Sequence, residues 1–126
     1  MFNSIVVGTD GSDTATQAVR EAVDVAGAVG ATLELVSAYA PVSEGEVEAS
    51  LEGAADIARA AGVNVNTHAI QGDPAEAILN VAEEQNADLV IIGNKGMTGA
   101  KRFLLGSVPD KISHHSPCSV LIVRTT

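Results

Sequence analysis

Apolar residues along this 126-residue chain fall into two kinds of pattern. Short runs rich in valine and isoleucine predict buried strands, and longer stretches with apolar residues every three or four positions predict amphipathic helices. The runs predict strands over residues 4–9, 32–39, 63–70, 87–92 and 119–124. The longer repeats predict helices over residues 12–29, 43–61, 74–85 and 107–115.

Strict alternation of strand and helix predicts an α/β protein, because parallel strands need crossover connections that are usually helical. We expect a three-layer, open, parallel five-stranded sheet with helices on both faces, in one domain over residues 1–126. The 63–70 strand alternates apolar and polar residues, which predicts a place at a sheet edge. In such sheets ligands bind beyond the carboxyl ends of the strands, where the strand order reverses.

Several helix ends carry capping residues. Asp73 stands directly before Pro74, a combination typical of a helix start. Ser43 and Glu46 have the spacing of a capping box. Gly30 follows the first predicted helix and predicts a left-handed end.

Two loops that follow predicted strands carry unusual chemistry. The first is Thr-Asp-Gly-Ser at residues 9–12, and the second is a glycine-rich stretch over residues 93–106 that leads into a helix at Ser107. Glycine lets the backbone approach a ligand, and successive free N–H groups make a nest for anions. The Ser107 hydroxyl either caps its own helix or binds a phosphate oxygen. These features predict a site for a di- or triphosphate.

The charge distribution supports an anion site. The chain has 7 Lys+Arg against 16 Asp+Glu, a net charge of -9, which opposes binding to nucleic acids and to anionic membranes. Yet Lys95, Lys101 and Arg102 all lie within the glycine-rich stretch. The alternative is a solvated loop whose cations offset nearby acids. The acidity itself fits either a salty cytoplasm or an ordinary acidic protein.

Composition excludes several classes. The longest strictly apolar run, residues 89–92, is far shorter than the roughly 20 residues of a membrane span. The amino terminus shows no secretory signal, and the single cysteine, Cys118, cannot form a disulfide within the chain. We therefore expect a cytoplasmic protein without a membrane or nucleic-acid partner, in which Cys118 is a buried, inert thiol.

No catalytic or metal site is expected from the sequence. The P-loop pattern is absent, and no G-x-G-x-x-G follows the first strand, which excludes a dehydrogenase. No nucleophile, base and orienting group occur together. His114 and His115 are adjacent on a helix and cannot converge on one ion, and His68 is expected to be a surface residue.

The glycine spacing is specific. Gly93-x-x-Gly96, nine residues and then Gly106-Ser107 resembles the G-2x-G-9x-G-[ST] signature of the nucleotide-binding branch of the universal stress protein family. The resemblance covers essentially the whole chain, including residues 8–12, 72–76, 87–90 and 115–118.

The resemblance implies a Rossmann-like sheet of order 3-2-1-4-5 and a nucleotide site. The residues that it assigns to the nucleotide are Gly8, Thr9, Asp10, Ala38, Ile92, Gly93, Lys95, Gly96, Gly106, Ser107 and Val108. The first four would lie near adenine and ribose, Ile92 and Gly93 near the ribose and first phosphates, and the rest around the phosphates, where Lys95 could supply charge. Pro109 departs from the family pattern. A proline has no N–H, so one amide donor is lost and a weaker nucleotide site is expected.

Three functional hypotheses follow from the resemblance. The first is a stress-response sensor or regulator that binds ATP, or else ADP or AMP, with Mg²⁺ on the phosphates. Such a protein would form a homodimer through the strand at residues 119–124 and act on a protein partner that the sequence does not identify. The second is a nucleotide-free dimeric interaction module of the same fold. The third is a slow ATP hydrolase.

Overall fold

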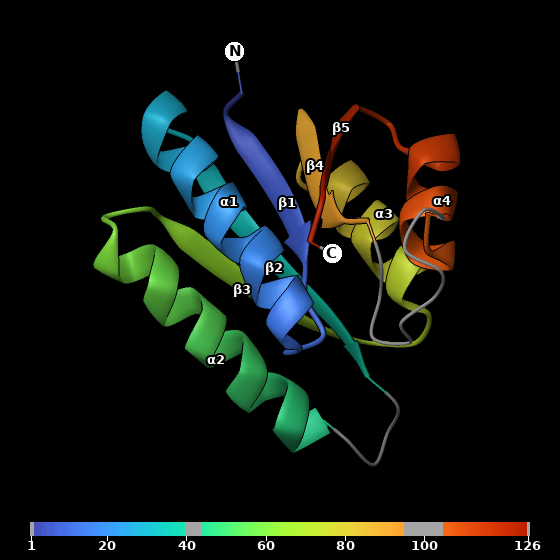
Figure 1. Cartoon of the computed structure of the whole chain (residues 1–126), viewed down its shortest axis with the longest axis horizontal. Coiled ribbons are helices and arrows are strands. Elements are labelled where there is room, and N and C mark those ends of the chain that lie inside the picture. The colour runs from blue at the N-terminus through green and yellow to red at the C-terminus, as the bar shows by residue number, and fades with distance from the viewer. Residues whose placement is uncertain (1, 40–43, 95–104, 126) are drawn as a thin grey trace.

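The computed structural model describes residues 2–39, 44–94 and 105–125. Strands and helices alternate along the chain as the apolar pattern predicts (Figure 1). The elements are β1 (Ser4–Gly8), α1 (Asp13–Val29), β2 (Thr32–Tyr39), α2 (Glu44–Ala60), β3 (Val65–Gln71), α3 (Pro74–Glu84), β4 (Leu89–Gly93), α4 (Ser107–His115) and β5 (Ser119–Val123).

The five strands form one parallel sheet in the order β3-β2-β1-β4-β5. This confirms the fold class and the strand order that the family resemblance implies. The chain builds outward from β1 to β3 and then returns to the other side of β1 with β4. Val7 of β1 therefore pairs with both Leu35 of β2 and Ile91 of β4. The carboxyl ends of β1 and β4 lie side by side at the point where the strand order reverses.

Helices cover both faces of the sheet. In β1, Ile5 and Val7 point into a core shared with α1 and α2, whereas Val6 points into a second core shared with α3 and α4. Every residue of β4 is buried, as expected for a strand covered on both faces. Each large aliphatic side chain buried in this way contributes about 1.5–3 kcal/mol.

Two described helix ends carry the predicted capping residues, and the start of α1 is capped by Ser12. The Ser12 Oγ accepts a hydrogen bond from the Ala15 N–H at 3.2 Å, and Gly30 ends α1 with a φ of 74°. At α3, the Asp73 carboxylate accepts from the Glu76 N–H at 3.0 Å, and Pro74 occupies the first turn. Ser43 lies outside the described residues, so the capping box predicted for α2 is not placed.

Two strands begin later than predicted: β4 starts at Leu89 rather than at residue 87, and β3 is the second case. The apolar pattern extends the third strand back to residue 63, but β3 starts at Val65. The N–H of Val63 donates instead to the Ala58 carbonyl at 3.0 Å, so this residue belongs to the turn that ends α2. The edge position of β3 is confirmed by the strand order.

His68, predicted to be a surface residue, is only partly exposed and has a buried partner. Its side chain is 23% exposed, and its Nε2 lies 2.7 Å from the Oε1 of Glu34, a β2 residue that is almost fully buried. The other carboxylate oxygen of Glu34 accepts from Asn66 Nδ2 at 3.0 Å. The buried Glu34 carboxylate thus has two partners on β3, the partly buried His68 and the exposed Asn66, because a buried charge needs hydrogen-bond partners.

Candidate functional site

The loop after β1 is tied together by its own hydrogen bonds. The Thr9 N–H donates to the Val36 carbonyl at 2.9 Å, and the Thr9 hydroxyl oxygen accepts from the Gly11 N–H at 3.1 Å. The Asp10 carboxylate accepts from the Ser12 N–H at 2.9 Å. Asp10 does not cap α1, since Ser12 does so, and its exposed carboxylate stands at the carboxyl edge of the sheet. The loop is therefore preformed and presents one acid.

Two glycines, the last residue of β1 and the third residue of the loop, lie close to helices. A Cβ on Gly8 would collide with the Ile78 side chain of α3 and lie 3.3 Å from Ile92. Gly11 has a φ of 81°, and a Cβ there would collide with the Ser50 hydroxyl of α2. The backbone at the end of β1 therefore lies close to both helical layers, with no side chain between.

The end of β2 contributes Ala38, which is partly buried and pairs in register with Ile70 of β3. The next residue, Tyr39, accepts the Gly72 N–H on its carbonyl at 3.0 Å. Partial burial raises the pKa of the Tyr39 hydroxyl, and the charge of Glu44 and a hydrogen bond with it raise the pKa further. Tyr39 is thus a neutral donor beside the residues 40–43, which lie outside the described residues.

Asn94 joins three parts of the structure at the end of β4. Its N–H donates to the Val123 carbonyl at 2.9 Å, and its carbonyl accepts the Gly106 N–H at 2.9 Å. Its side-chain Oδ1 accepts from Thr125, both from the N–H at 2.8 Å and from the hydroxyl at 3.1 Å. The two ends of the glycine-rich stretch therefore meet at Asn94, and Lys95 and Gly96 lie outside the described residues.

Helix α4 begins beside this junction. Its N-cap is Gly106, and no side chain caps the helix, so of the two roles considered for the Ser107 hydroxyl, capping its own helix is not the one observed. Ser107 instead occupies the first helical position. Pro109 has no N–H, and the Asp110 N–H donates to the Gly106 carbonyl at 3.0 Å. Among the acceptors that the structure describes, none takes the amides of Ser107 or Val108.

The fold gathers the described members of the predicted site at one edge. Gly8, Thr9 and Asp10 follow β1, and Ile92 and Gly93 close the neighbouring β4. The bond from Gly106 to Asn94 places the first turn of α4, with Ser107 and Val108, at the same edge. Ala38 lies two residues beyond Val36, the β2 partner of Gly8. The edge combines an exposed carboxylate, close main chain and a helix amino end that attracts anions.

The comparison with known families agrees with this geometry. The model of the universal stress protein family matches residues 1–124. This chain belongs to that family. Universal stress protein Rv1636 of Mycobacterium tuberculosis is 38% identical over 144 aligned positions, which cover 99% of this chain and 98% of the relative.

Solved structures of the family share the fold. A universal stress protein crystallised in complex with cAMP matches with a TM-score of 0.87 and 39% identity, over 99% of this chain and 98% of that one. The universal stress protein of Archaeoglobus fulgidus in complex with dAMP matches with a TM-score of 0.81 at 24% identity, over 98% of each chain, which shows the common fold.

Sequence reasoning missed Asn94, although it lies inside the family signature. Its position is one of the two variable places between Gly93 and Gly96, so the signature assigns it no role. Its partner, Thr125, lies far along the chain at the end of β5. The one signal in the sequence is an asparagine side chain at the start of the glycine-rich stretch. An asparagine in a loop has many possible hydrogen-bond partners, so this signal does not identify Thr125.

The remaining charged groups near α4 are paired at the surface. Lys111 Nζ lies 3.6 Å from the Asp73 carboxylate and 3.4 Å from that of Glu76, so it links α4 to the start of α3. His114 Nε2 lies 3.5 Å from the Asp110 carboxylate. No group of three potential metal ligands occurs among the residues that the structure describes.

Two further observations bear on the sequence predictions. Cys118 is half-buried, not buried as predicted, with its Sγ 3.7 Å from the Ser116 hydroxyl oxygen. Within residues 2–39, 44–94 and 105–125, no helix has the length and apolar character needed to cross a membrane.

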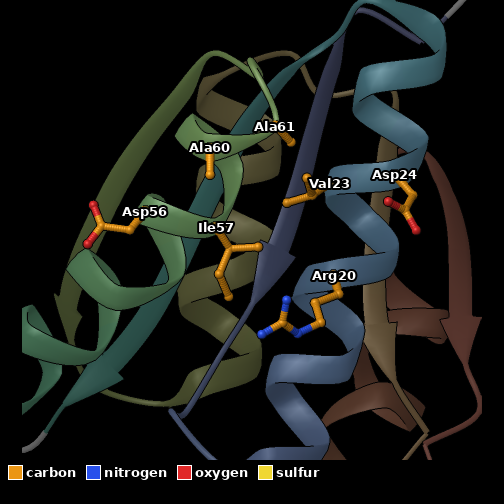
Figure 2. Close-up of a pocket in the computed structure, with 7 residues that line it drawn as sticks. All are labelled: Arg20, Val23, Asp24, Asp56, Ile57, Ala60 and Ala61. Carbon is orange, nitrogen blue, oxygen red and sulfur yellow. The ribbon is translucent and has the colours of Figure 1, made fainter.

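A separate hollow of about 630 Å³ lies between α1 and α2. Figure 2 shows that Val23 and Ile57 face one another across it and that Arg20 extends toward it from α1. Asp24 and Asp56 belong to the same lining. Its lining comes from α1, α2 and the turn after α2 and contains none of the predicted nucleotide residues, so it is distinct from the carboxyl edge where those residues gather.

Proposed function

We propose that this universal stress protein binds an adenine nucleotide, with ATP as the expected ligand, at the carboxyl ends of β1 and β4. It would act as a nucleotide-dependent sensor or regulator of the stress response in the cytoplasm. The observation that carries the proposal is that the loop after β1, the end of β4 and the amino end of α4 meet at one edge of the sheet.

Each part of this edge has a role in the proposal. The exposed Asp10 carboxylate accepts hydrogen bonds from ribose hydroxyls, and the main chain at Gly8, Thr9 and Ala38 borders the adenine. The amides of Ser107 and Val108 donate to phosphate oxygens, helped by the partial positive charge of the helix end. Gly93, Lys95 and Gly96 complete the phosphate site in the proposal. Mg²⁺ would be held mainly by phosphate oxygens and water.

A second candidate ligand is a nucleotide with a single phosphate, AMP or cAMP. The Gly106 amide is engaged by Asn94, and Pro109 has no N–H, so the described start of α4 offers few donors for a triphosphate. The 39% identical relative that was crystallised with cAMP supports the same candidate.

Ligand-dependent melting separates these candidates. A nucleotide present at a thousandfold excess over its Kd stabilises the folded protein by about 4 kcal/mol. Melting curves with ATP, AMP and cAMP, each with and without Mg²⁺, give the order of affinities. If millimolar amounts of all three leave the melting temperature unchanged, the protein is the nucleotide-free interaction module and the proposal is wrong.

A substitution at the helix start tests the location of the site. Gly106 has φ -64° and ψ 163°, which valine adopts without strain, so Gly106→Val should fold. Its side chain would stand where the phosphate approaches, and we expect ATP affinity to fall by about a hundredfold, on the order of 3 kcal/mol. Gly53→Ala on α2, where a Cβ meets nothing within 4 Å, is the matched control and should bind as the wild type does.

Hydrolysis is a slow side reaction in this proposal. The exposed Asp10 is the acid nearest to the proposed ribose position, and no described His or Cys accompanies it at this edge. ATP turnover that disappears in Asp10→Ala while ATP binding persists would point instead to a dedicated hydrolase.

The proposal also includes a homodimer formed through residues 119–124. Leu121 and Ile122 of β5 are 41% and 37% exposed at the edge of the sheet. An unpaired edge strand with apolar side chains favours association with a second strand.

A further inference from the structure

The Asn94 side chain has a defined orientation. It faces the Thr125 N–H at 2.8 Å and the Thr125 hydroxyl at 3.1 Å. A backbone N–H can only donate, so the atom that meets it must be the amide oxygen of Asn94. That oxygen accepts both bonds, and together they hold the segment after β5 against the end of β4.

The main chain of the same residue holds the start of α4. The Gly106 N–H donates to the Asn94 carbonyl at 2.9 Å, and Gly106 is the N-cap of a helix that no side chain caps. Asn94 therefore holds Gly106 through its main-chain carbonyl and Thr125 through its side-chain oxygen, so one residue links the start of α4 to the segment after β5.

We propose that Asn94 is a positioning residue that couples the nucleotide site to the carboxyl end of β5. The inference rests on the proposed function, because the first turn of α4 is the proposed phosphate site. A nucleotide that orders this turn also stabilises the bonds from Asn94 to Thr125. Because coupling between two sites is reciprocal, loss of the bonds from Asn94 to Thr125 must in turn lower the affinity for the nucleotide.

The residue type fits this task. An aspartate would accept the same two bonds but would place a negative charge beside the proposed phosphate site. A serine is too short to span the same distance to Thr125. A leucine has a similar size but accepts no hydrogen bond, so Asn94→Leu removes the link with the least change in volume.

The test combines affinity with amide hydrogen exchange on the full chain, with Mg-ATP and adenosine as probes. We expect Asn94→Leu to lower the affinity for Mg-ATP by about tenfold. The affinity for adenosine should fall much less, because the lost contacts support only the phosphate end of the site. In the wild type, Mg-ATP should slow exchange of the Thr125 amide. In Asn94→Leu that slowing should disappear, which a general loss of stability would not produce selectively.

Substitutions at Thr125 provide a matched pair on the other side of the link. Thr125→Val removes only the hydroxyl donor and should lower the affinity for Mg-ATP by about threefold. Thr125→Ser keeps the donor and should bind Mg-ATP as the wild type does. This pair also carries the test if Asn94→Leu does not fold. Equal affinities for the two Thr125 variants would then overturn the inference.

The two proposals fail in different ways. If ATP, AMP and cAMP all leave the melting temperature of the wild type unchanged, the proposed function is wrong, and so is the coupling that rests on it. If the wild type binds Mg-ATP and Asn94→Leu binds it within about twofold, with Thr125 exchange still slowed, the coupling alone is wrong.

Discussion

At the β3 edge of the sheet a buried carboxylate holds two polar side chains of the outermost strand, whereas at the β5 edge apolar side chains stand in solvent. Glu34 bonds to Asn66 and His68 across β2 and β3. On β5, Leu121 and Ile122 are both more than one-third exposed, and β4 is its one strand partner within the part of the chain that the structure describes.

The difference shows that the same sheet solves the problem of exposed edges in two ways. At the β3 edge, the polar side chains of Asn66 and His68 hydrogen-bond to Glu34 of the next strand. This edge exposes no large apolar side chain among the described residues. Among the described strands the β5 edge pairs only with β4, and it exposes apolar side chains, a combination that favours pairing with another strand. The protein can therefore associate through β5 without also associating through β3.

The largest effect is expected from breaking the β3 edge. His68→Leu leaves the Glu34 carboxylate buried with Asn66 as its remaining side-chain partner. Removing one partner of a buried charge is costly, and we expect the free energy of unfolding to fall by about 2–3 kcal/mol in urea denaturation.

The double variant Glu34→Leu/His68→Leu is the control for this prediction. It removes the charge together with its partner, so most of the lost stability should return. A loss below about 0.5 kcal/mol in His68→Leu would mean that water replaces the imidazole and that the pair does not hold the edge.

The next effect concerns the β5 edge and tests the proposed homodimer. Leu121→Lys should weaken self-association by about 2 kcal/mol, roughly thirtyfold in the dissociation constant, because the apolar side chain no longer leaves water on pairing. Sedimentation equilibrium measures this directly. Val29→Lys is the matched control, since Val29 is 42% exposed at the end of α1 and lies away from β5.

An unchanged dimer in Leu121→Lys, or an equal loss in Val29→Lys, would place the contact elsewhere on the molecule. A wild type that is monomeric at every concentration would remove the contrast between the two edges altogether.

The smallest effect sharpens the description of the β3 edge. Glu34→Gln keeps a similar shape and can bond to both Asn66 and His68, but it removes the charge. We expect a loss of about 0.5 kcal/mol, because weaker hydrogen bonds are offset by the lower cost of burying a neutral group. A loss as large as that of His68→Leu would show that the charge itself holds β3.

Much of the fold could be predicted because it is encoded locally. Apolar runs placed all five strands, and Asp73 with Pro74 marked the start of α3. The strand order was different in kind. Periodicity does not say which parallel strands are neighbours, so the order came from the family resemblance and was confirmed by the sheet.

The polar contacts between distant segments could not be predicted. Glu34 lies between two buried leucines of β2, and alternation alone places it on the opposite face without naming a partner. His68 and Asn94 each find their partner on a strand or segment more than thirty positions away. Pairs of this kind depend on strand register and helix placement, which exist only in the folded chain.

The close approach at the end of β1 restricts how this protein can be altered. Any side chain at Gly8 meets the end of the Ile78 side chain, so a larger residue near the proposed adenine must either displace Ile78 or be matched by a smaller residue on α3. The two positions are expected to drift as a pair during evolution. Engineering of base selectivity from β1 should therefore begin with libraries that vary both codons together.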